Sequence, residues 1–112
     1  MFGQTTENQP NILWITCEDL NAYLGSYGDS QAITPNLDRL ASEGVKFTQA
    51  FATAPVCSPA RSALITGIYA TSMGTQHLRS EVEIPDEVKT LPHNLREAGY
   101  YCSNNSKEDY NF

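Results

Sequence analysis

Basic residues are scarce in this sequence. Its 112 residues include 7 lysines and arginines against 13 aspartates and glutamates, which gives a formal net charge of −6. Because nucleic acids are bound largely by neutralising their phosphates with lysine and arginine, this balance argues against a nucleic-acid partner. Long apolar runs are also missing, so we expect no segment to span a membrane.

Cysteine is sparse as well, with only Cys17, Cys57 and Cys102. An odd number at irregular spacing does not indicate a disulfide framework, and no Cys-x-x-Cys pair suggests a zinc site. The polar first residues show no intact signal peptide. We therefore divide the chain into a polar N-terminal segment, residues 1–10, and one domain-sized stretch, residues 11–112.

Short strand-like runs alternate with capped helical segments. Residues 11–16 form an apolar, β-branched run that predicts a buried parallel strand, and strands are also predicted over residues 45–51 and 100–105. Helices are predicted over residues 34–44, 58–67 and 90–99, because each range begins with Ser or Thr, has proline in its first turn and reaches glycine at its end. This alternation predicts an α/β fold. The stretch from Ile68 to Glu87 is predicted to be irregular.

Cys57 lies at the start of the second predicted helix, where Ser58 is the expected cap and Pro59 fits the first turn. A side chain at this position sits at the positive end of the helix dipole, where an anion is stabilised. Arg61 adds a full positive charge nearby. From the residues alone, this is either an anion site beside a thiol or a buried cysteine with a surface arginine.

Four other residues carry candidate functional groups. Glu18 and Asp19 follow the first predicted strand, at the end where open α/β sheets bind ligands. Two adjacent carboxylates suit a hard divalent cation, although a solvated acidic turn is the commoner explanation of such a pair. Lys107 follows the third predicted strand and points toward the site or into solvent. His77 is either a pocket residue or a surface histidine.

Residues 57–61 resemble a known signature. Their sequence, Cys-Ser-Pro-Ala-Arg, matches the Cys-x-Pro-x-Arg motif of the type I sulfatases, and residues 62–67 extend the match. Residues 34–44 are similar to a recurrent sulfatase segment, and residues 104–111 to an Asn-Asn-x-Lys-x-Asp-Tyr-Asn run found in some members. The chain is therefore identified as the N-terminal portion of a type I sulfatase, within the alkaline-phosphatase-like superfamily.

The resemblance implies a mostly parallel sheet flanked by helices, truncated here at the C-terminus because sulfatase catalytic domains are several times longer. It also implies that a formylglycine-generating maturation enzyme oxidises Cys57 before folding. One hydroxyl of the hydrated aldehyde would then attack sulfur and expel the alcohol of the ester. Loss of the proton of the second hydroxyl would regenerate the aldehyde and release sulfate. We expect this fragment alone to show little turnover.

Family roles carry over to individual residues. Glu18, Asp19 and the modified Cys57 are expected to bind Ca²⁺, with Mg²⁺ as the alternative, although Glu18 departs from the usual aspartate. Arg61 is expected to orient the hydrated aldehyde, and Lys107 to neutralise a sulfate oxygen.

The downstream segment departs from the family pattern at one position. Asp109 stands where many sulfatases have histidine, which leaves that role open, and His77 is kept as a candidate pocket residue. Two further metal ligands and at least two histidines are expected beyond Phe112.

The implied substrate is a sulfated small molecule or carbohydrate, and the implied location is periplasmic or secreted. Two alternatives stay open. A phosphonate or phosphate ester hydrolase of the same superfamily can use the same motif. A non-enzymatic α/β module would keep the Cys57 thiol and bind an anion at the helix end.

Overall fold

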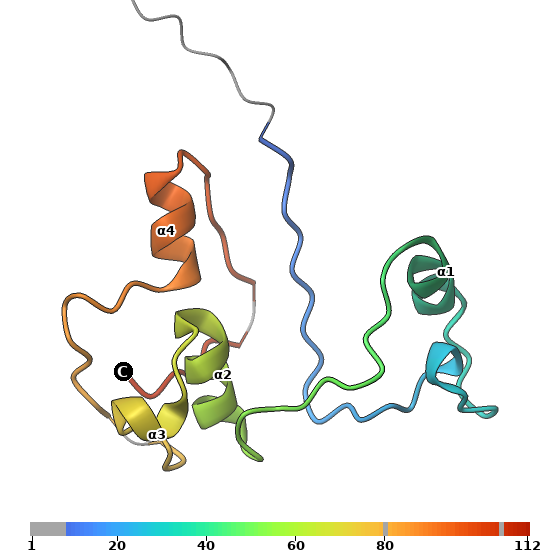
Figure 1. Cartoon of the computed structure of the whole chain (residues 1–112), viewed down its shortest axis with the longest axis horizontal. Helices are drawn as coiled ribbons and strands as arrows, with labels where there is room; N and C mark the ends of the chain where they lie inside the picture. Colours follow the sequence, from blue (N-terminus) through green and yellow to red (C-terminus); the bar gives the residue numbers. More distant parts are fainter. Residues whose placement is uncertain (1–8, 80, 106) are drawn as a thin grey trace, which may run out of the picture. The chain divides into compact units, whose positions relative to one another are not determined.

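The computed structural model describes residues 9–79, 81–105 and 107–112 (Figure 1). These residues form one 3₁₀ turn, η1 (Gly25–Tyr27), and four α-helices: α1 (Pro35–Glu43), α2 (Cys57–Thr66), α3 (Ala70–Met73) and α4 (Leu91–Glu97). The chain divides into two compact units, Met1–Lys46 and Phe47–Phe112. None of the helices in the described ranges is long and apolar enough to cross a membrane.

In the first unit, η1 lies against α1. Helix α1 begins at Pro35 and ends before Gly44, which confirms the predicted range. Thr34 occupies the expected N-cap position, but its hydroxyl makes no hydrogen bond to the helix amides. Instead it accepts a hydrogen bond from the Gly25 amide at 3.0 Å and donates one to Asp38 at 3.0 Å. Thr34 therefore joins η1 to α1.

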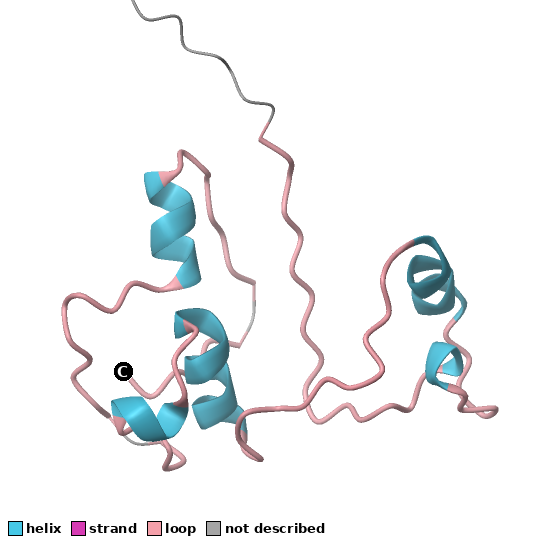
Figure 2. Ribbon diagram, in the orientation of Figure 1, coloured by secondary structure: helices cyan, strands magenta, loops and turns pink. Residues whose placement is uncertain are grey.

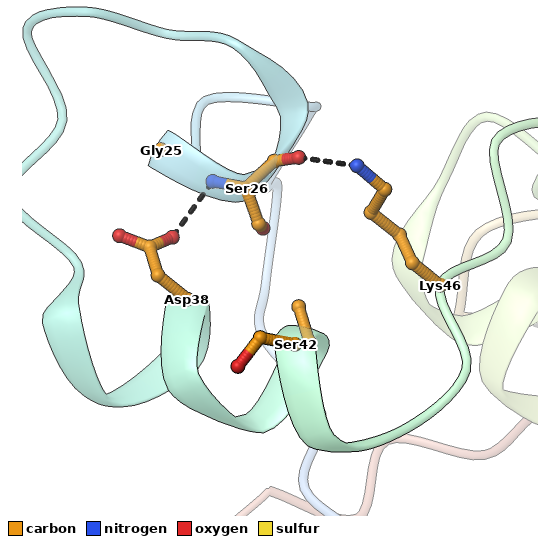
Figure 3. A pocket seen from close by; sticks show the side chains of 6 residues that line it. Gly25, Ser26, Asp38, Ser42 and Lys46 are labelled. Carbon is orange, nitrogen blue, oxygen red and sulfur yellow. Dashed lines mark hydrogen bonds between the residues drawn. The ribbon is translucent and has the colours of Figure 1, made fainter.

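A hollow between η1 and α1 is lined mostly by small and charged side chains (Figure 3). Its two charged residues both contact the backbone of Ser26. Asp38 accepts a hydrogen bond from the Ser26 amide at 2.7 Å, and Lys46 donates one to the Ser26 carbonyl at 2.6 Å. These charges therefore brace the 3₁₀ turn from both sides.

In the second unit, α2 packs against α3 and α4. The buried positions of α2 are Ser58, Pro59, Ser62 and Ala63. The helix ends at Gly67, whose φ of 73° is left-handed and whose amide bonds to the Ala63 carbonyl at 2.8 Å. This terminus confirms the predicted glycine stop.

The predicted N-terminus of α2 needs a correction. The helix begins at Cys57, with Val56 in the extended N-cap position, so Ser58 is not the cap. Ser58 is fully buried, and its hydroxyl accepts a hydrogen bond from the Arg79 amide at 3.5 Å. The Ser58 hydroxyl therefore contacts the loop at Arg79 and does not cap the helix.

The stretch from Ile68 to Glu87 is more ordered than predicted. It contains α3, which ends at Gly74 in the left-handed conformation with φ of 75°. Thr75 closes the turn by donating its amide to the Ala70 carbonyl at 2.9 Å. The prediction of an irregular stretch is therefore wrong for one helical turn.

No strand forms within the described ranges, and Figure 2 draws the three predicted strand segments as loop. Leu13 in the first of them is 84 % exposed and Phe51 in the second is 87 % exposed. A strand is held by backbone hydrogen bonds to a neighbour, and a buried parallel strand also needs cover on both faces. The described residues supply neither for these segments, so the sheet stays a prediction.

Candidate functional site

Cys57 is the first residue of α2 and a half-buried free thiol. Ser58 and Pro59, which follow it, are buried, so the backbone beneath Cys57 is fixed by packing. The first turn of an α-helix carries amides that lack partners within the helix, and they favour negative charge. The helix start therefore gives Cys57 an environment suited to an anion.

Arg61 lies one turn after Cys57, a spacing that puts the two side chains on the same side of α2. Its Nη1 donates a hydrogen bond to the backbone carbonyl of Lys107 at 3.3 Å. The Lys107 ammonium lies 3.3 Å from the carboxylate of Asp109, and both side chains are about one-third exposed (34 % and 31 %). Two predicted site residues, Arg61 and Lys107, are therefore brought together.

Asp109 has a left-handed backbone, with φ of 47°. Side chains with a Cβ rarely adopt this conformation, although aspartate tolerates it better than most. The turn places the Asp109 carboxylate beside Lys107 at the position where the family pattern has histidine. In this chain, the group next to the predicted sulfate-binding lysine is thus an anion.

The segment that carries Lys107 is fixed by Asn111, which is 1 % exposed. The backbone amide of Asn111 donates a hydrogen bond to the Ser62 hydroxyl of α2 at 3.1 Å. Its side-chain nitrogen donates to the carbonyls of Thr75 at 2.8 Å and His77 at 2.6 Å. Its carbonyl accepts from the Val82 amide at 3.0 Å. Asn111 therefore joins α2, the turn after α3 and the loop beyond it.

Sequence reasoning gave Asn111 no role. The residue lies inside the Asn-Asn-x-Lys-x-Asp-Tyr-Asn run, so the motif contained it. Two of its hydrogen-bond partners, Ser62 and Thr75, are fully buried and were missed as well. A buried polar cluster of this kind is visible only once distant segments are placed side by side.

His77 contributes its backbone carbonyl to this cluster, while the residue itself is exposed. Two residues on, Arg79 has a left-handed φ of 59° and bonds through its amide to Ser58. The loop that carries His77 is therefore fixed against α2. A role for the imidazole in the reaction stays a prediction.

Glu18 and Asp19 lie in the first unit, and both are exposed. Asp19 has a left-handed φ of 50°, at a bend after the first predicted strand. Carboxylate oxygens are the ligands that Ca²⁺ prefers, but the ion takes six to eight of them. Across the described ranges, no three His, Cys, Asp or Glu side chains gather into a metal site. The pair fits a calcium site in its chemistry and supplies only part of one.

Comparison with known proteins gives a consistent result. A sequence model of the Sulfatase family matches residues 10–111. The chain is 43 % identical to an ulvan-active sulfatase of Formosa agariphila, over 93 % of this chain and 20 % of that protein. It is 39 % identical to the human N-acetylgalactosamine-6-sulfatase, over 81 % of this chain and 20 % of that protein.

A third relative, the steryl-sulfatase of Mus musculus, is 52 % identical over 58 % of this chain and 11 % of that protein. The chain thus spans about one-fifth or less of the length of these relatives. No solved structure matches it.

Proposed function

Because the chain belongs to the sulfatase family, we propose that the complete enzyme hydrolyses sulfate monoesters at a site centred on Cys57. The observation that carries the proposal is the position of Cys57 at the start of α2, with Arg61 one turn away and bonded to the backbone of Lys107. The proposal also draws on the family match, which covers nearly the whole chain.

The arrangement suits the charge of the substrate. A sulfate monoester carries one negative charge and a poor alkoxide leaving group, so its hydrolysis needs charge neutralisation and a positioned nucleophile. The start of a ten-residue helix contributes roughly half a positive charge, and Arg61 adds a full one. Lys107 adds another, which the Asp109 carboxylate at 3.3 Å offsets in part. Arg61 is assigned to orient the group at Cys57, and Lys107 to bind a sulfate oxygen.

Two groups implied by the family complete the assignment. Formylglycine made from Cys57 would supply, as a hydrate, a hydroxyl nucleophile and a second hydroxyl that allows sulfate to leave. A Ca²⁺ ion, with Mg²⁺ as the other candidate, would supply Lewis-acid stabilisation of sulfate oxygens. Glu18 and Asp19 would hold that ion together with ligands outside residues 1–112.

The proposed substrate class is sulfated carbohydrate. Ulvan and N-acetylgalactosamine, which give two relatives their names, are carbohydrates, and these relatives match more of the chain than the steryl-sulfatase does. A periplasmic or secreted location, where such substrates occur, is proposed with it.

The test is mass spectrometry of the peptide spanning Cys57, after coexpression of the complete enzyme with a formylglycine-generating enzyme. We expect the thiol to be converted to an aldehyde that a hydrazide traps, and Cys57→Ala to remove the trapped product. An unmodified thiol, beside a converted control sulfatase, would favour the non-enzymatic anion-binding module.

Rates on matched aryl sulfate and aryl phosphonate esters then separate the two hydrolase assignments. Faster turnover of the sulfate ester supports the proposal. Preference for the phosphonate ester would assign the enzyme to the other branch of the superfamily.

A further inference from the structure

The chemistry of the Asn111 side chain accounts for its place in the fold. One amide nitrogen donates to two carbonyls, those of Thr75 and His77. A serine or threonine hydroxyl has one proton to donate, and an aspartate carboxylate has none. Of the residues with similar size, only asparagine can therefore hold both carbonyls from this position.

The amide is kept despite a cost. Among the described residues, the Asn111 Oδ1 has no hydrogen-bond partner, and it is buried. A buried acceptor left without a partner destabilises a protein. Its two donations to the loop carbonyls must therefore outweigh that cost.

The contacts of Asn111 set the register of the lysine segment on α2. Ser62 and Arg61 are neighbours on the helix, and they bond to Asn111 and to the carbonyl of Lys107, respectively. Two adjacent helix residues thus hold two points of the same short segment. The left-handed turn at Asp109 lies between those points, where a disfavoured backbone conformation needs restraint on both sides.

We propose that Asn111 is a positioning residue that holds Lys107 in place to bind the sulfate group. This inference rests on the proposed function. Asn111 is 1 % exposed, so it acts through Lys107 without touching the substrate. Its role is to keep the lysine segment on α2 while the one-third-exposed side chain of Lys107, which also contacts Asp109, meets the anion.

The test is a double-mutant cycle in the complete enzyme, with binding of inorganic sulfate as the primary readout. Asn111→Asp keeps the shape but turns a donor into an acceptor that faces two carbonyls. We expect it to weaken sulfate binding on the order of tenfold, as Lys107→Ala does. If Asn111 acts through Lys107, the double variant binds no more weakly than Lys107→Ala alone.

Additive losses would overturn the inference, because a purely structural residue would weaken binding whether or not the lysine is present. Asn104→Ala is the matched control: Asn104 is exposed in the same segment, and its replacement should leave binding unchanged. Ser62→Ala provides a milder variant if Asn111→Asp fails to fold. It removes one of the hydrogen bonds and should show the same dependence on Lys107.

Sulfate binding and turnover separate this inference from the proposed function. A wild-type enzyme that binds sulfate but hydrolyses no sulfate ester contradicts the function, and the cycle still decides the role of Asn111. An active enzyme with additive losses contradicts only the role of Asn111. Failure of the wild-type enzyme to bind sulfate overturns the inference.

Discussion

The guanidinium of Arg61 donates a hydrogen bond to the backbone carbonyl of Lys107 at 3.3 Å, although 46 residues separate the two in sequence. One candidate site residue therefore helps to hold the main chain that carries another. A substitution at Arg61 is therefore expected to have two effects. It changes the charge beside Cys57, and it removes a hydrogen bond that helps to position Lys107.

Replacing Arg61 with lysine keeps the charge and removes the planar fork of donors. We expect Arg61→Lys in the complete enzyme to lower kcat/KM for an aryl sulfate on the order of a hundredfold, the scale of losing one preorganised donor. The exposed Arg96 of α4 provides the control, since Arg96→Lys should leave kcat/KM unchanged. Near-normal activity of Arg61→Lys would show that charge alone is sufficient.

Removal of calcium should reveal whether Asp19 is a ligand. A bound ion stabilises the native state by about 2.7 kcal/mol at a hundredfold excess over its Kd. We expect a chelator to lower the melting temperature of the complete enzyme, and Asp19→Asn to reduce that response. The exposed Asp86, replaced by asparagine, should leave the response to the chelator intact. Equal responses in all three proteins would exclude Asp19 as a ligand.

Gly25 has no room for a side chain. A Cβ at this position would lie 2.7 Å from the Asp38 carboxylate, which is itself held by the Ser26 amide and the Thr34 hydroxyl. We expect Gly25→Ala to destabilise the first unit by about 1–3 kcal/mol, the usual range for overpacking. Chemical denaturation of the wild type and the variant, followed by circular dichroism, measures the loss.

The clash with Asp38 can be isolated by a second substitution. In an Asp38→Ala background the obstructing carboxylate is gone, so Gly25→Ala should cost less than it does in the wild type. The same cost in both backgrounds would mean that backbone entropy, and not the clash, is responsible.

Glu97 lies 2.6 Å from the Lys89 ammonium. The hydrogen bond from Lys89, followed by its charge, holds the pKa of Glu97 below its ordinary value of 4.5, and His93 adds a smaller attraction. Because the folded-state pKa is lowered, the stabilisation is present above the unfolded pKa and is lost as the pH falls through the folded pKa. The contribution is small, since both side chains are exposed.

Lys89→Met should therefore raise the pKa of Glu97 toward 4.5, as measured by NMR titration of its carboxyl carbon. Lys46→Met, in the other unit, should leave that pKa unchanged. A Glu97 pKa that stays low without Lys89 would assign the shift to another group.

Local signals in the sequence were sufficient to predict α1, α2 and α4, but not α3. Pro35 and Gly44 bound α1 in sequence and structure alike, and Gly67 ends α2 as expected. These positions depend on backbone preferences that act within a few residues. Ser58 was misassigned because its best partner is the amide of Arg79, which no local pattern reveals.

The candidate site likewise has features that local sequence predicts and features that depend on distant segments. The motif predicts Cys57 and Arg61 as site residues, and the spacing that places them on the same side of α2 lies within one helix. The contact between Arg61 and Lys107 and the buried position of Asn111 depend on how distant segments pack. Strands were predicted from apolar runs. A run such as residues 11–16 specifies only an apolar surface that must be buried, whereas the neighbouring strands and the helices that would bury it are not encoded in the run itself.

The hydrogen bond between Ser62 and Asn111 joins residues that are 49 positions apart. At about 5–20 residues per second, the ribosome makes Asn111 roughly 2–10 s after it makes Ser62. During that interval, residues 57–66 have been made, but the segment that holds them in the folded chain has not. If Cys57 is oxidised before folding, as proposed, the maturation enzyme would act within a period set by chain length, and a longer loop between α2 and Lys107 would extend that period.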